Sequence, residues 1–455
     1  MYRWRRCTRR GSRGERRGST DLKRRFAVIG GGYAGFAAAV TLAGVGCEVA
    51  VFEAARTLGG RSRRVDAYGT PVDNGAHILL GAYRQTLELL RIVHGEGADN
   101  ELLDRRRLIL EQPGVFRMRT PGLPAPLHLA AALITMRGIS WRDRVRTAAF
   151  ARHVARSRFY CSPQLTVAGL LSEQPAAVVE LLWQPLCIAA LNTPIESASA
   201  QMFLNVMRLA FAAHARDSDL ILPRVDLSTL FPDAAAAFVT DRGGSIRAGT
   251  TVGSVVATKD DVIVTAGYTD ERFAAAIVAV GPHQLERLLA SSITTGAVAQ
   301  ALAQVAAFAF EPITTAYLKY PTPLKVSLPM LKLDSDPGQW LFSRELLDGP
   351  AGLAAVVVST EASGAKIAHE VLAEAIDAQL RRLMPKLPAP TWTQVIAERR
   401  ATYACSPGLR RPAAGLLVAR LYLAGDYTDA ELPATLEAAT RSGVMAARAL
   451  LAAHP

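Results

Sequence analysis

Two apolar runs near the start of the chain enclose an alanine-rich stretch. Residues 26–32 (FAVIGGG) predict a strand that enters a glycine turn, residues 33–43 predict a helix, and residues 48–52 (EVAVF) predict a second strand. Short apolar runs bounded by glycine are typical of buried strands, and the stretch between them is long enough for several helical turns. The pattern therefore predicts a β-α-β unit.

The hydrophobic pattern changes several times further along the chain. Residues 101–225 are basic and have a helical pattern broken by prolines, whereas residues 226–290 return to short strands around glycines. Residues 291–394 combine long strands with a helix near 365–383, and a strand at 421–425 (LYLAG) precedes an alanine-rich helix at 435–451. We expect an α/β fold, in which a Rossmann-type domain (26–100, 226–290 and 395–455) is interleaved with a mixed α+β substrate domain (101–225 and 291–394).

Positive charge is concentrated at the start of the chain. The formal net charge is +12, and residues 1–25 hold eleven Lys and Arg residues against two acids, Glu15 and Asp21. This segment has no apolar run and does not resemble a secretory signal, so we expect a disordered basic tail. Because charge alone specifies no partner, we predict no nucleic-acid binding.

Cysteine usage and apolar segments set further limits. The cysteines are scattered, without a Cys-x-x-Cys pair or a Cys/His cluster, which argues against a disulfide framework and a metal site and favours a reducing cytoplasm. A membrane-spanning helix needs about 18 uninterrupted apolar residues, and the nearest candidate, residues 127–136, is too short. We expect a cytoplasmic protein that does not cross a membrane.

A glycine motif follows the first strand. In Gly30-x-Gly32-x-x-Gly35, the first glycine permits a tight turn, the second lets the backbone approach a pyrophosphate, and the third lets the helix pack closely on the strand. The helix that starts here, at Tyr33 and Ala34, offers free N–H groups to phosphates. Glu53 ends the second strand, where an acid can accept hydrogen bonds from ribose hydroxyls. Together these features predict a dinucleotide site.

Two further motifs favour FAD over NAD. Gly59-Gly60-Arg61 supplies a second glycine pair near the pyrophosphate and a counter-charge. Gly425-Asp426 ends the last predicted strand, where a carboxylate can reach the ribityl hydroxyls. The helix that begins near Thr435 can direct its N-terminus at the flavin pyrimidine edge, which becomes anionic on reduction. A nicotinamide dinucleotide has no such need for a distant C-terminal strand.

These motifs resemble the amine oxidase and phytoene desaturase superfamily of FAD enzymes. Within it, the chain is most similar to the hydroxysqualene dehydroxylase family of bacterial hopanoid pathways, from about residue 26 to 450. Five separated blocks carry this resemblance: DNGAHILLGAYRQTLELL (73–90), WQPLCIAALNTPIESASAQMFLNVM (183–207), LILPRVDLSTLFP (220–232), GQWLFSR (338–344) and AGDYTDAELPATLEAATRSG (424–443).

The resemblance implies a reaction and assigns more residues to FAD. Reduced flavin would replace the hydroxyl of a C30 polyprenyl alcohol with hydrogen, giving squalene and water. Val252 resembles the residue whose backbone meets the adenine, Ala76 and His77 resemble the segment along the flavin, and Leu436 resembles the residue at the pyrimidine edge. Ala54 and Arg56 accompany Glu53. The chain departs from the family in three places, with Ala76 for Gln, Ser343 for Asp and Ala438 for Gly.

Loss of a hydroxyl requires a nearby protonated acid. His77 is our first candidate, because its strand should run beneath the flavin and its pKa is naturally near neutral; the alternative is that it only hydrogen-bonds the backbone. Asp429 and Glu431 are further candidates in the loop before the final helix, where they face either substrate or solvent. Asp73 and Asp426 complete the set. For Cys405 we favour a buried thiol over a covalent flavin tether.

A long apolar substrate suggests two surfaces to examine. One helical face carries Phe203, Met207, Ala210 and Phe211, which either lines a tunnel or belongs to the core. The arginines 142, 146, 152 and 156 share another helical face, next to the apolar 127–136 segment, and this pairing favours peripheral association with the inner membrane. A solvated basic helix is the alternative.

The electron donor and two rival activities stay open at this stage. Only one Gly-x-Gly-x-x-Gly is present, so we expect no separate NAD(P)H domain and an external reductant. A carotenoid-type desaturase shares the superfamily motifs. A flavin amine oxidase would need an aromatic cage, for which Tyr83, Trp183 and Tyr427 are available. An apolar wall beside the flavin would argue against the amine oxidase. A non-enzymatic scaffold that acts through its basic tail is a third rival.

Overall fold

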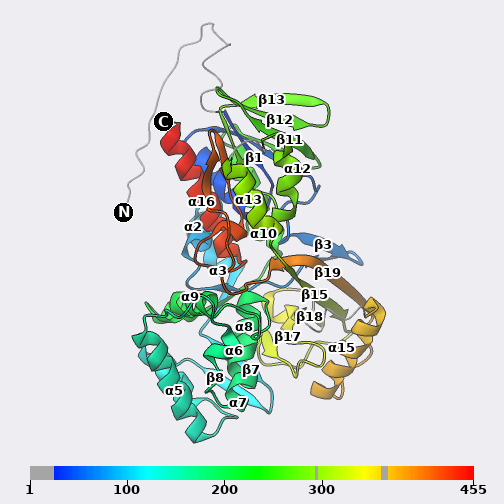
Figure 1. Ribbon diagram of the computed structural model, residues 1–455. Coiled ribbons are helices and arrows are strands. Elements are labelled where there is room, and N and C mark those ends of the chain that lie inside the picture. The colour runs from blue at the N-terminus through cyan, green and yellow to red at the C-terminus, as the bar shows by residue number, and fades with distance from the viewer. Residues whose placement is uncertain (1–24, 293–295, 360–366, 455) are drawn as a thin grey trace.

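The computed structural model describes residues 25–292, 296–359 and 367–454. Apart from Arg25, the basic tail lies outside the described residues. The expected α/β fold is confirmed by a six-stranded sheet at one end of the molecule (Figure 1). Its strands, in spatial order, are β10 (Ser245–Arg247), β2 (Glu48–Phe52), β1 (Arg25–Ile29), β14 (Ala275–Val278), β21 (Leu421–Leu423) and β20 (Gly415–Val418).

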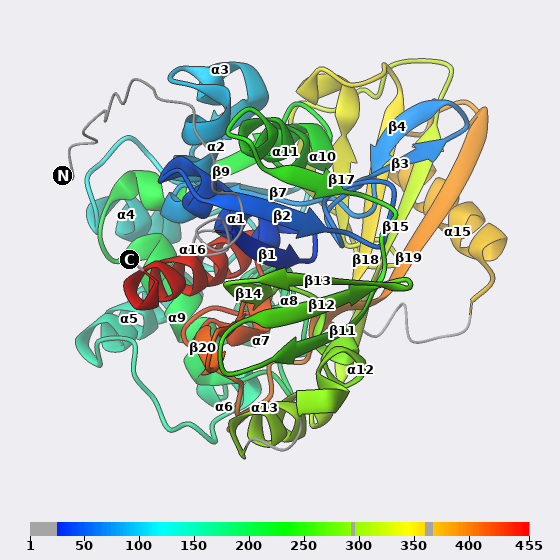
Figure 2. The same cartoon turned by 90° about the horizontal axis from the view of Figure 1, so that it is seen from above.

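The first five strands of this sheet are parallel, and β20 is antiparallel to β21. Parallel sheets are usually covered on both faces, which explains the continuous apolar strands of this sequence. One face carries α1 (Tyr33–Gly44) and α16 (Leu436–Ala453), with α2 (Arg84–His94) and α11 (Pro232–Thr240) beyond them. The other face packs against an antiparallel meander of β11 (Val252–Ala257), β12 (Val262–Ala266) and β13 (Thr269–Phe273) (Figure 2).

Two glycines allow α1 to pack closely on its neighbours. A Cβ at Gly35 would lie 1.8 Å from the carbonyl oxygen of Gly30, so α1 sits on the end of β1 as the motif predicts. A Cβ at Gly443 would lie 2.1 Å from the carbonyl oxygen of Ala34. The first and last helices of the described chain are therefore in backbone contact.

A five-stranded antiparallel sheet builds the second part of the molecule. Its order is β16 (Met330–Lys332), β17 (Trp340–Ser343), β18 (Leu353–Ser359), β15 (Phe310–Lys319) and β19 (Trp392–Tyr403). Helix α15 (His369–Leu383) buries one face of this sheet, and the opposite face joins the main core. The helix that was predicted near 365–383 begins at His369 among the described residues.

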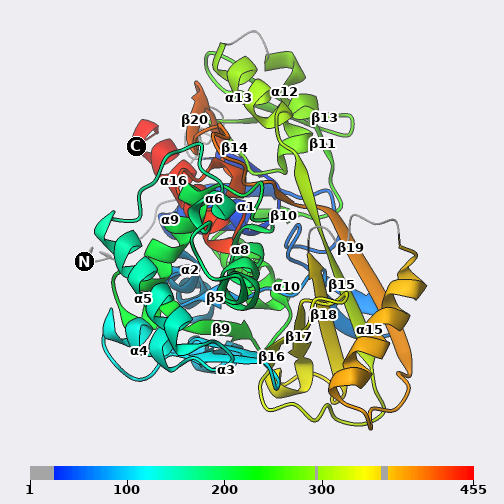
Figure 3. The same ribbon diagram turned by 60° about the horizontal axis from the view of Figure 1, so that its bottom comes forward.

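Residues 101–225, which were expected to be helical, also contain strands. Its helices are α4 (Leu127–Thr135), α5 (Trp141–Arg156), α6 (Val167–Leu170), α7 (Ala176–Val178), α8 (Gln184–Leu191) and α9 (Ala200–Phe211), with a π-helical turn before α8 (Figure 3). The strands are β6 (Leu103–Arg106), β7 (Ile109–Gln112), β8 (Phe116–Arg119) and β9 (Leu220–Pro223), and β9 pairs with β6 and with β5 (Leu79–Leu80). The expected helical pattern of residues 101–225 was therefore incomplete, because each of these strands is only four residues long and gives little periodic signal.

Candidate cofactor and substrate site

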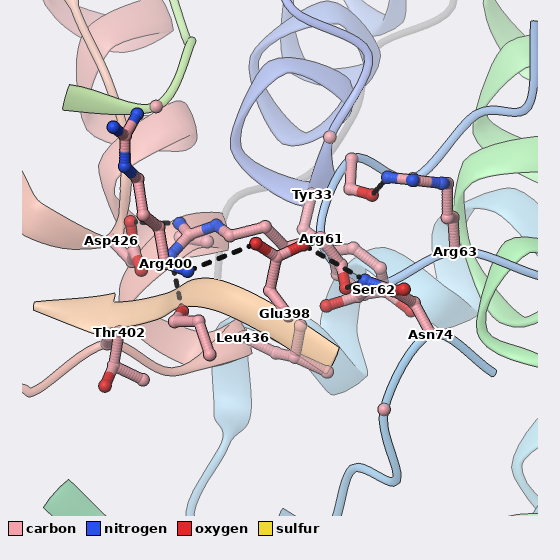
Figure 4. A pocket seen from close by; sticks show the side chains of 18 of the residues that line it. Tyr33, Arg61, Ser62, Arg63, Asn74, Glu398, Arg400, Thr402, Asp426 and Leu436 are labelled. Carbon is pink, nitrogen blue, oxygen red and sulfur yellow. Dashed lines mark hydrogen bonds and ion pairs between the residues drawn. The ribbon is translucent and has the colours of Figure 1, made fainter. Parts of the chain in front are cut away.

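A cavity of about 850 Å³ lies at the carboxyl ends of the parallel strands, where α/β sheets commonly bind ligands. Strands β1, β2, β14 and β21 each end at its wall, and the antiparallel sheet and α8 form the opposite wall. Figure 4 shows side chains from distant parts of the chain meeting there. Sixteen of the residues predicted to contact FAD line it: Gly30, Gly32, Tyr33, Ala34, Glu53, Ala54, Gly59, Gly60, Arg61, Ala76, His77, Val252, Gly425, Asp426, Thr435 and Leu436.

Two predicted cofactor residues lie outside this lining. Gly35 packs behind the cavity against β1, which fits the helix-packing role of the third glycine. Arg56 is exposed and is absent from the wall. Its expected contribution beside Glu53 is therefore not supported by the geometry.

The glycine turn and Glu53 have the geometry that a dinucleotide requires. Gly30 has a φ of +113°, and a Cβ there would lie 2.4 Å from the carbonyl oxygen of Ala279. The Glu53 carboxylate accepts hydrogen bonds from the backbone N–H of Gly31 (2.7 Å) and of Ala55 (2.8 Å), which fixes it at the end of β2. A Cβ at Gly32 would meet nothing closer than 3.9 Å, so this face of the turn is open to a ligand. The residues present fit FAD.

The two charged residues of the second and third motifs contact each other. Nη2 of Arg61 lies 2.7 Å from Oδ1 of Asp426, and Nη1 donates to the carbonyl oxygen of Ala401 at 2.8 Å (Figure 4). Asp426 is 5 % exposed, whereas the side chain of Arg61 is 37 % exposed at the cavity wall, so only the carboxylate of the pair is shielded from solvent. The pair joins the loop after β2 to the loop after β21.

The N-terminus of α16 faces the same cavity. Thr435 caps this helix by accepting a hydrogen bond from the N–H of Ala438 at 3.1 Å, and both Thr435 and Leu436 line the wall. The N–H of Gly425 donates to Oγ of Ser442 at 2.9 Å, which fixes the end of β21 against α16. A helix N-terminus in this place favours a partial negative charge on the ligand.

His77 is held by two hydrogen bonds. Its Nδ1 lies 2.8 Å from the carbonyl oxygen of Gly75, and its Nε2 lies 3.1 Å from Oγ of Ser62. Because a carbonyl oxygen can only accept, the proton is on Nδ1, and Nε2 of the neutral ring accepts from the Ser62 hydroxyl. Burial lowers the pKa of His77, which favours the uncharged ring. The geometry therefore favours a positioning role over the predicted acid role.

Asp429 and Glu431, for which the sequence left substrate and solvent as alternatives, lie outside the cavity lining. Oδ1 of Asp429 accepts the N–H groups of Glu431 and Leu432 at 2.9 Å each, and its Oδ2 lies 3.1 Å from Nε of Arg441. The exposed carboxylate of Glu431 pairs with Arg441 and with Arg208. These acids fold their loop onto α16 and α9.

The wall opposite the glycine turn is mainly apolar. Residues 188–191 of α8 contribute Ile, Ala, Ala and Leu, and the antiparallel sheet contributes Ile313, Trp340, Phe342 and Val357. Of the three aromatic residues considered for an amine cage, Tyr83 lines the cavity, whereas Trp183 and Tyr427 do not. The lining therefore lacks the aromatic cage that these residues could have formed.

Two other sequence predictions are settled by burial. Phe203, Met207 and Ala210 are at most 8 % exposed, belong to the hydrophobic core and do not line the cavity. The stripe on α9 is therefore core. Cys405 is also buried away from the lining, and burial raises the pKa of its thiol to about 12, so the reactive thiolate is disfavoured.

Several polar residues of the wall were not predicted from the sequence. Glu398 and Arg400 come from β19, where Oε2 of Glu398 lies 3.4 Å from Nδ2 of Asn74 (Figure 4). Nδ2 of Asn192 donates to Oγ1 of Thr402 at 2.9 Å. Long-range strand pairing places these residues, and no local motif marks them. Arg63 is different, because it follows the glycine pair by only three residues and the sequence could have indicated it.

Residues 33–451 match the model of the flavin containing amine oxidoreductases, and the chain belongs to this family. It is an FAD-dependent oxidoreductase. Among proteins of known name, it is 29% identical to the hydroxysqualene dehydroxylase of Rhodopseudomonas palustris, over 94% of this chain and 98% of that protein. It is 23% identical to a probable zeta-carotene desaturase of Synechococcus elongatus, over 94% of this chain and 99% of that protein.

A solved structure has the same fold. An oxidoreductase from Methanosarcina mazei superposes with a TM-score of 0.70 at 15% identity, covering 94% of this chain and 100% of that one. At this identity the likeness concerns the fold alone. It supports the arrangement of the parallel and antiparallel sheets.

Proposed function

We propose that this enzyme carries out the reductive dehydroxylation of hydroxysqualene to squalene. The reaction breaks one C–O bond and forms one C–H bond, and the hydroxyl leaves as water after it accepts a proton. The similarity to a hydroxysqualene dehydroxylase over nearly the whole chain supports this choice of substrate. The proposed substrate is a long polyprenyl molecule.

The observation that carries the proposal is the apolar wall of the cavity. Ile188, Leu191, Ile313, Phe342 and Val357 offer hydrocarbon surface to a ligand, and burial of apolar surface is the main source of affinity for a polyprenyl chain. An amine substrate would instead need an aromatic cage.

The proposal assigns FAD to the glycine-lined end of the cavity. Glu53 would bind the adenosine ribose, the turn at Gly30 and Gly32 and the pair Gly59-Gly60 would approach the pyrophosphate, and Asp426 would bind the ribityl chain. When bound, FAD in its reduced form supplies the hydride that the reaction requires. The reductant that restores it is external to this chain.

Within this proposal, His77 orients the wall rather than delivering the proton. The ring connects the Gly75 carbonyl with the Ser62 hydroxyl and so fixes the segment that contains Ala76. Its lowered pKa leaves little of the protonated form at neutral pH. Asp429 and Glu431 have no part in the chemistry proposed here.

A carotenoid-type desaturase is the second candidate. The probable zeta-carotene desaturase that this chain resembles favours it, and an apolar wall suits both substrates. The two activities differ in the direction of hydride transfer, because a desaturase oxidises its substrate and leaves the flavin reduced.

A substrate panel separates these candidates. The purified holoenzyme is supplied with hydroxysqualene plus dithionite, with ζ-carotene plus a quinone, or with putrescine in air, and products are identified by mass spectrometry. The proposal expects squalene in the first reaction alone. Desaturated carotenoid without squalene would transfer the assignment to the second candidate, and aldehyde with hydrogen peroxide would transfer it to an amine oxidase.

We also propose that the enzyme works as a peripheral protein at the cytoplasmic membrane face. Among the described helices, none is long and apolar enough to cross a membrane. Helices α4 and α5 lie together at one end of the molecule and expose Leu127, Trp141 and Val145 (Figure 3). The arginines 142, 146, 152 and 156 of α5 are also exposed.

Vesicle flotation of the double variant L127S/W141S tests this surface. Vesicle binding as strong as that of the unchanged chain would contradict the proposed membrane association.

A further inference from the structure

A second cavity, of about 820 Å³, lies at the end of the molecule remote from the meander β11–β13. Its walls come from α2, from α3 (Ala98–Leu102), β6 and β9, from the loop 120–124, and from the first turn of α4 (Figure 3). It shares no lining residue with the FAD and substrate cavity. The reaction proposed above makes no use of it.

The lining of this second cavity is rich in positive charge. It contains five arginines and three aspartates: Arg91, Arg105, Arg107, Arg216, Arg224, Asp99, Asp104 and Asp219. Three of the arginines are paired, Arg91 with Asp99 at 2.6 Å, Arg105 with Asp219 at 2.9 Å, and Arg224 with Asp348 at 2.6 Å. The guanidinium groups of the other two have no carboxylate partner among the described residues. The lining therefore carries surplus positive charge.

Gly122 leaves room for the guanidinium group of Arg107, one of these two arginines. A Cβ at Gly122 would lie 2.8 Å from Nη2 of Arg107, so a larger residue would displace the guanidinium. Arg216 comes from a different segment of the lining, the turn Ala215–Ser218. The two unpaired guanidinium groups are contributed by separate segments.

Buried polar atoms without partners provide a second, independent observation. His128 lines this cavity and is 1 % exposed, and its ring is buried near the backbone of Pro124. Nε of Arg224 and Oδ1 of Asp99 are buried without a partner within the described structure. Buried polar atoms are nearly always satisfied, so these two atoms indicate a polar ligand.

We propose that the second cavity binds a phosphate ester. Arg107 and Arg216 bind the phosphate oxygens from different segments of the lining. Guanidinium groups bind phosphate by paired, charge-assisted hydrogen bonds. The cavity is far larger than a bare phosphate ion, which leaves room for the ester's alcohol part.

The phosphate could be part of a soluble metabolite or of a lipid headgroup, and the surroundings favour the headgroup. Leu123 lines the cavity and is 42 % exposed, and Leu127, at the start of α4, is 57 % exposed. Exposed apolar side chains at the rim of a basic pocket suit the boundary between acyl chains and headgroups. The site itself does not depend on the dehydroxylase reaction.

Two probes and two double variants test the proposal. Binding of glycerol 3-phosphate is measured by calorimetry, and binding of phosphatidylcholine vesicles that contain phosphatidic acid is measured by flotation, each with the FAD-loaded full chain. R107Q/R216Q removes the two unpaired charges at exposed positions, so folding should be preserved. R410Q/R448Q is the matched control, because both arginines are exposed and line neither cavity.

The expected result is that R107Q/R216Q weakens phosphate binding by about tenfold or more, while R410Q/R448Q binds as the unchanged chain does. Loss of glycerol 3-phosphate binding with unchanged vesicle binding assigns a soluble phosphate ester, and loss of vesicle binding assigns a lipid headgroup. If the unchanged chain binds neither probe, or if both double variants lose binding equally, the proposal is overturned.

Discussion

At the scale of single residues, the side chains that line the main cavity are of two kinds: some are free to contact a ligand, and others hydrogen-bond to the surrounding backbone and position it. In the proposal, His77 belongs to the second kind. Its two ring nitrogens are occupied by Gly75 and Ser62, and burial lowers its pKa. The sequence placed His77 beside the cavity, but its burial, which lowers the pKa, and the hydrogen bonds that fix its tautomer become visible only in the fold.

Replacement of His77 by asparagine distinguishes positioning from acid catalysis. The amide N–H₂ of H77N can donate to the Gly75 carbonyl in place of Nδ1, so we expect turnover within about tenfold of the unchanged enzyme and the same pH profile. Removal of a general acid would instead lower turnover by about 10²–10⁴-fold. Steady-state squalene formation between pH 5.5 and 8.5 measures this. A loss of that size, together with a missing acidic limb, would restore His77 as the acid.

Glu431 provides a second test at this scale. Its carboxylate is half exposed and pairs with Arg208 and Arg441 away from the cavity. We expect E431Q to keep its turnover and to change the free energy of unfolding by less than about 1 kcal/mol, because exposed ion pairs contribute little. Thermal melts and product assays measure both. A hundredfold loss of turnover with unchanged stability would show that the loop approaches the substrate after all.

Asp73 should make stability depend on pH. Burial raises its pKa from 3.8 to about 6, although Oδ1 accepts the Leu227 N–H at 2.7 Å. Because the pKa is raised on folding, the stabilising contribution is present below about pH 4 and is lost as the pH rises through 6. Relative to D73N, the unchanged chain should lose about 3 kcal/mol of unfolding free energy between pH 4 and 7.5. Urea denaturation at several pH values measures this.

The control for this prediction is D260N, at an exposed aspartate. Its stability should follow that of the unchanged chain across the same pH range. If D73N and D260N have the same pH dependence, Asp73 is not the group that titrates.

At the scale of elements, the sequence predicted what is encoded locally. The β-α-β unit has almost the predicted bounds, with β1 at Arg25–Ile29, α1 at Tyr33–Gly44 and β2 at Glu48–Phe52, because apolar runs and glycines define it within thirty residues. Strands β6 (LDRR) and β7 (ILEQ) escaped prediction because each is only four residues long and has no regular alternation of apolar and polar residues, and because β6 pairs with the distant strand β9. Glu398 and Asn192 were missed for the same reason: strand pairing and packing bring them to the cavity.

The contact of α1 with α16 gives a prediction for an element. G443A would place a methyl group 2.1 Å from the carbonyl oxygen of Ala34 and force the helices apart. We expect a loss of about 2 kcal/mol in the free energy of unfolding, as for other overpacked sites. We also expect weaker retention of FAD, because the N-termini of both helices lie at the cavity. M445A, at a residue 49 % exposed on α16, should be nearly neutral. Equal stability of the two variants would contradict the close helix contact.

At the scale of the whole molecule, the two ends of the described chain build one site. The ion pair between Arg61 and Asp426 and the packing of α1 on α16 connect segments more than 350 residues apart. The antiparallel sheet and α8 complete the cavity with an apolar wall. This arrangement explains why the cofactor motifs lie near both ends of the sequence, with the substrate wall encoded between them.

The measurement that tests the proposed reaction most directly is a single anaerobic turnover. The holoenzyme is photoreduced, hydroxysqualene is added without any other reductant, and flavin absorbance is followed while products are quantified by mass. The proposal predicts that the oxidised flavin spectrum returns and that one squalene is formed for each flavin reoxidised. A flavin that stays reduced in the presence of hydroxysqualene, with no squalene formed, would contradict it.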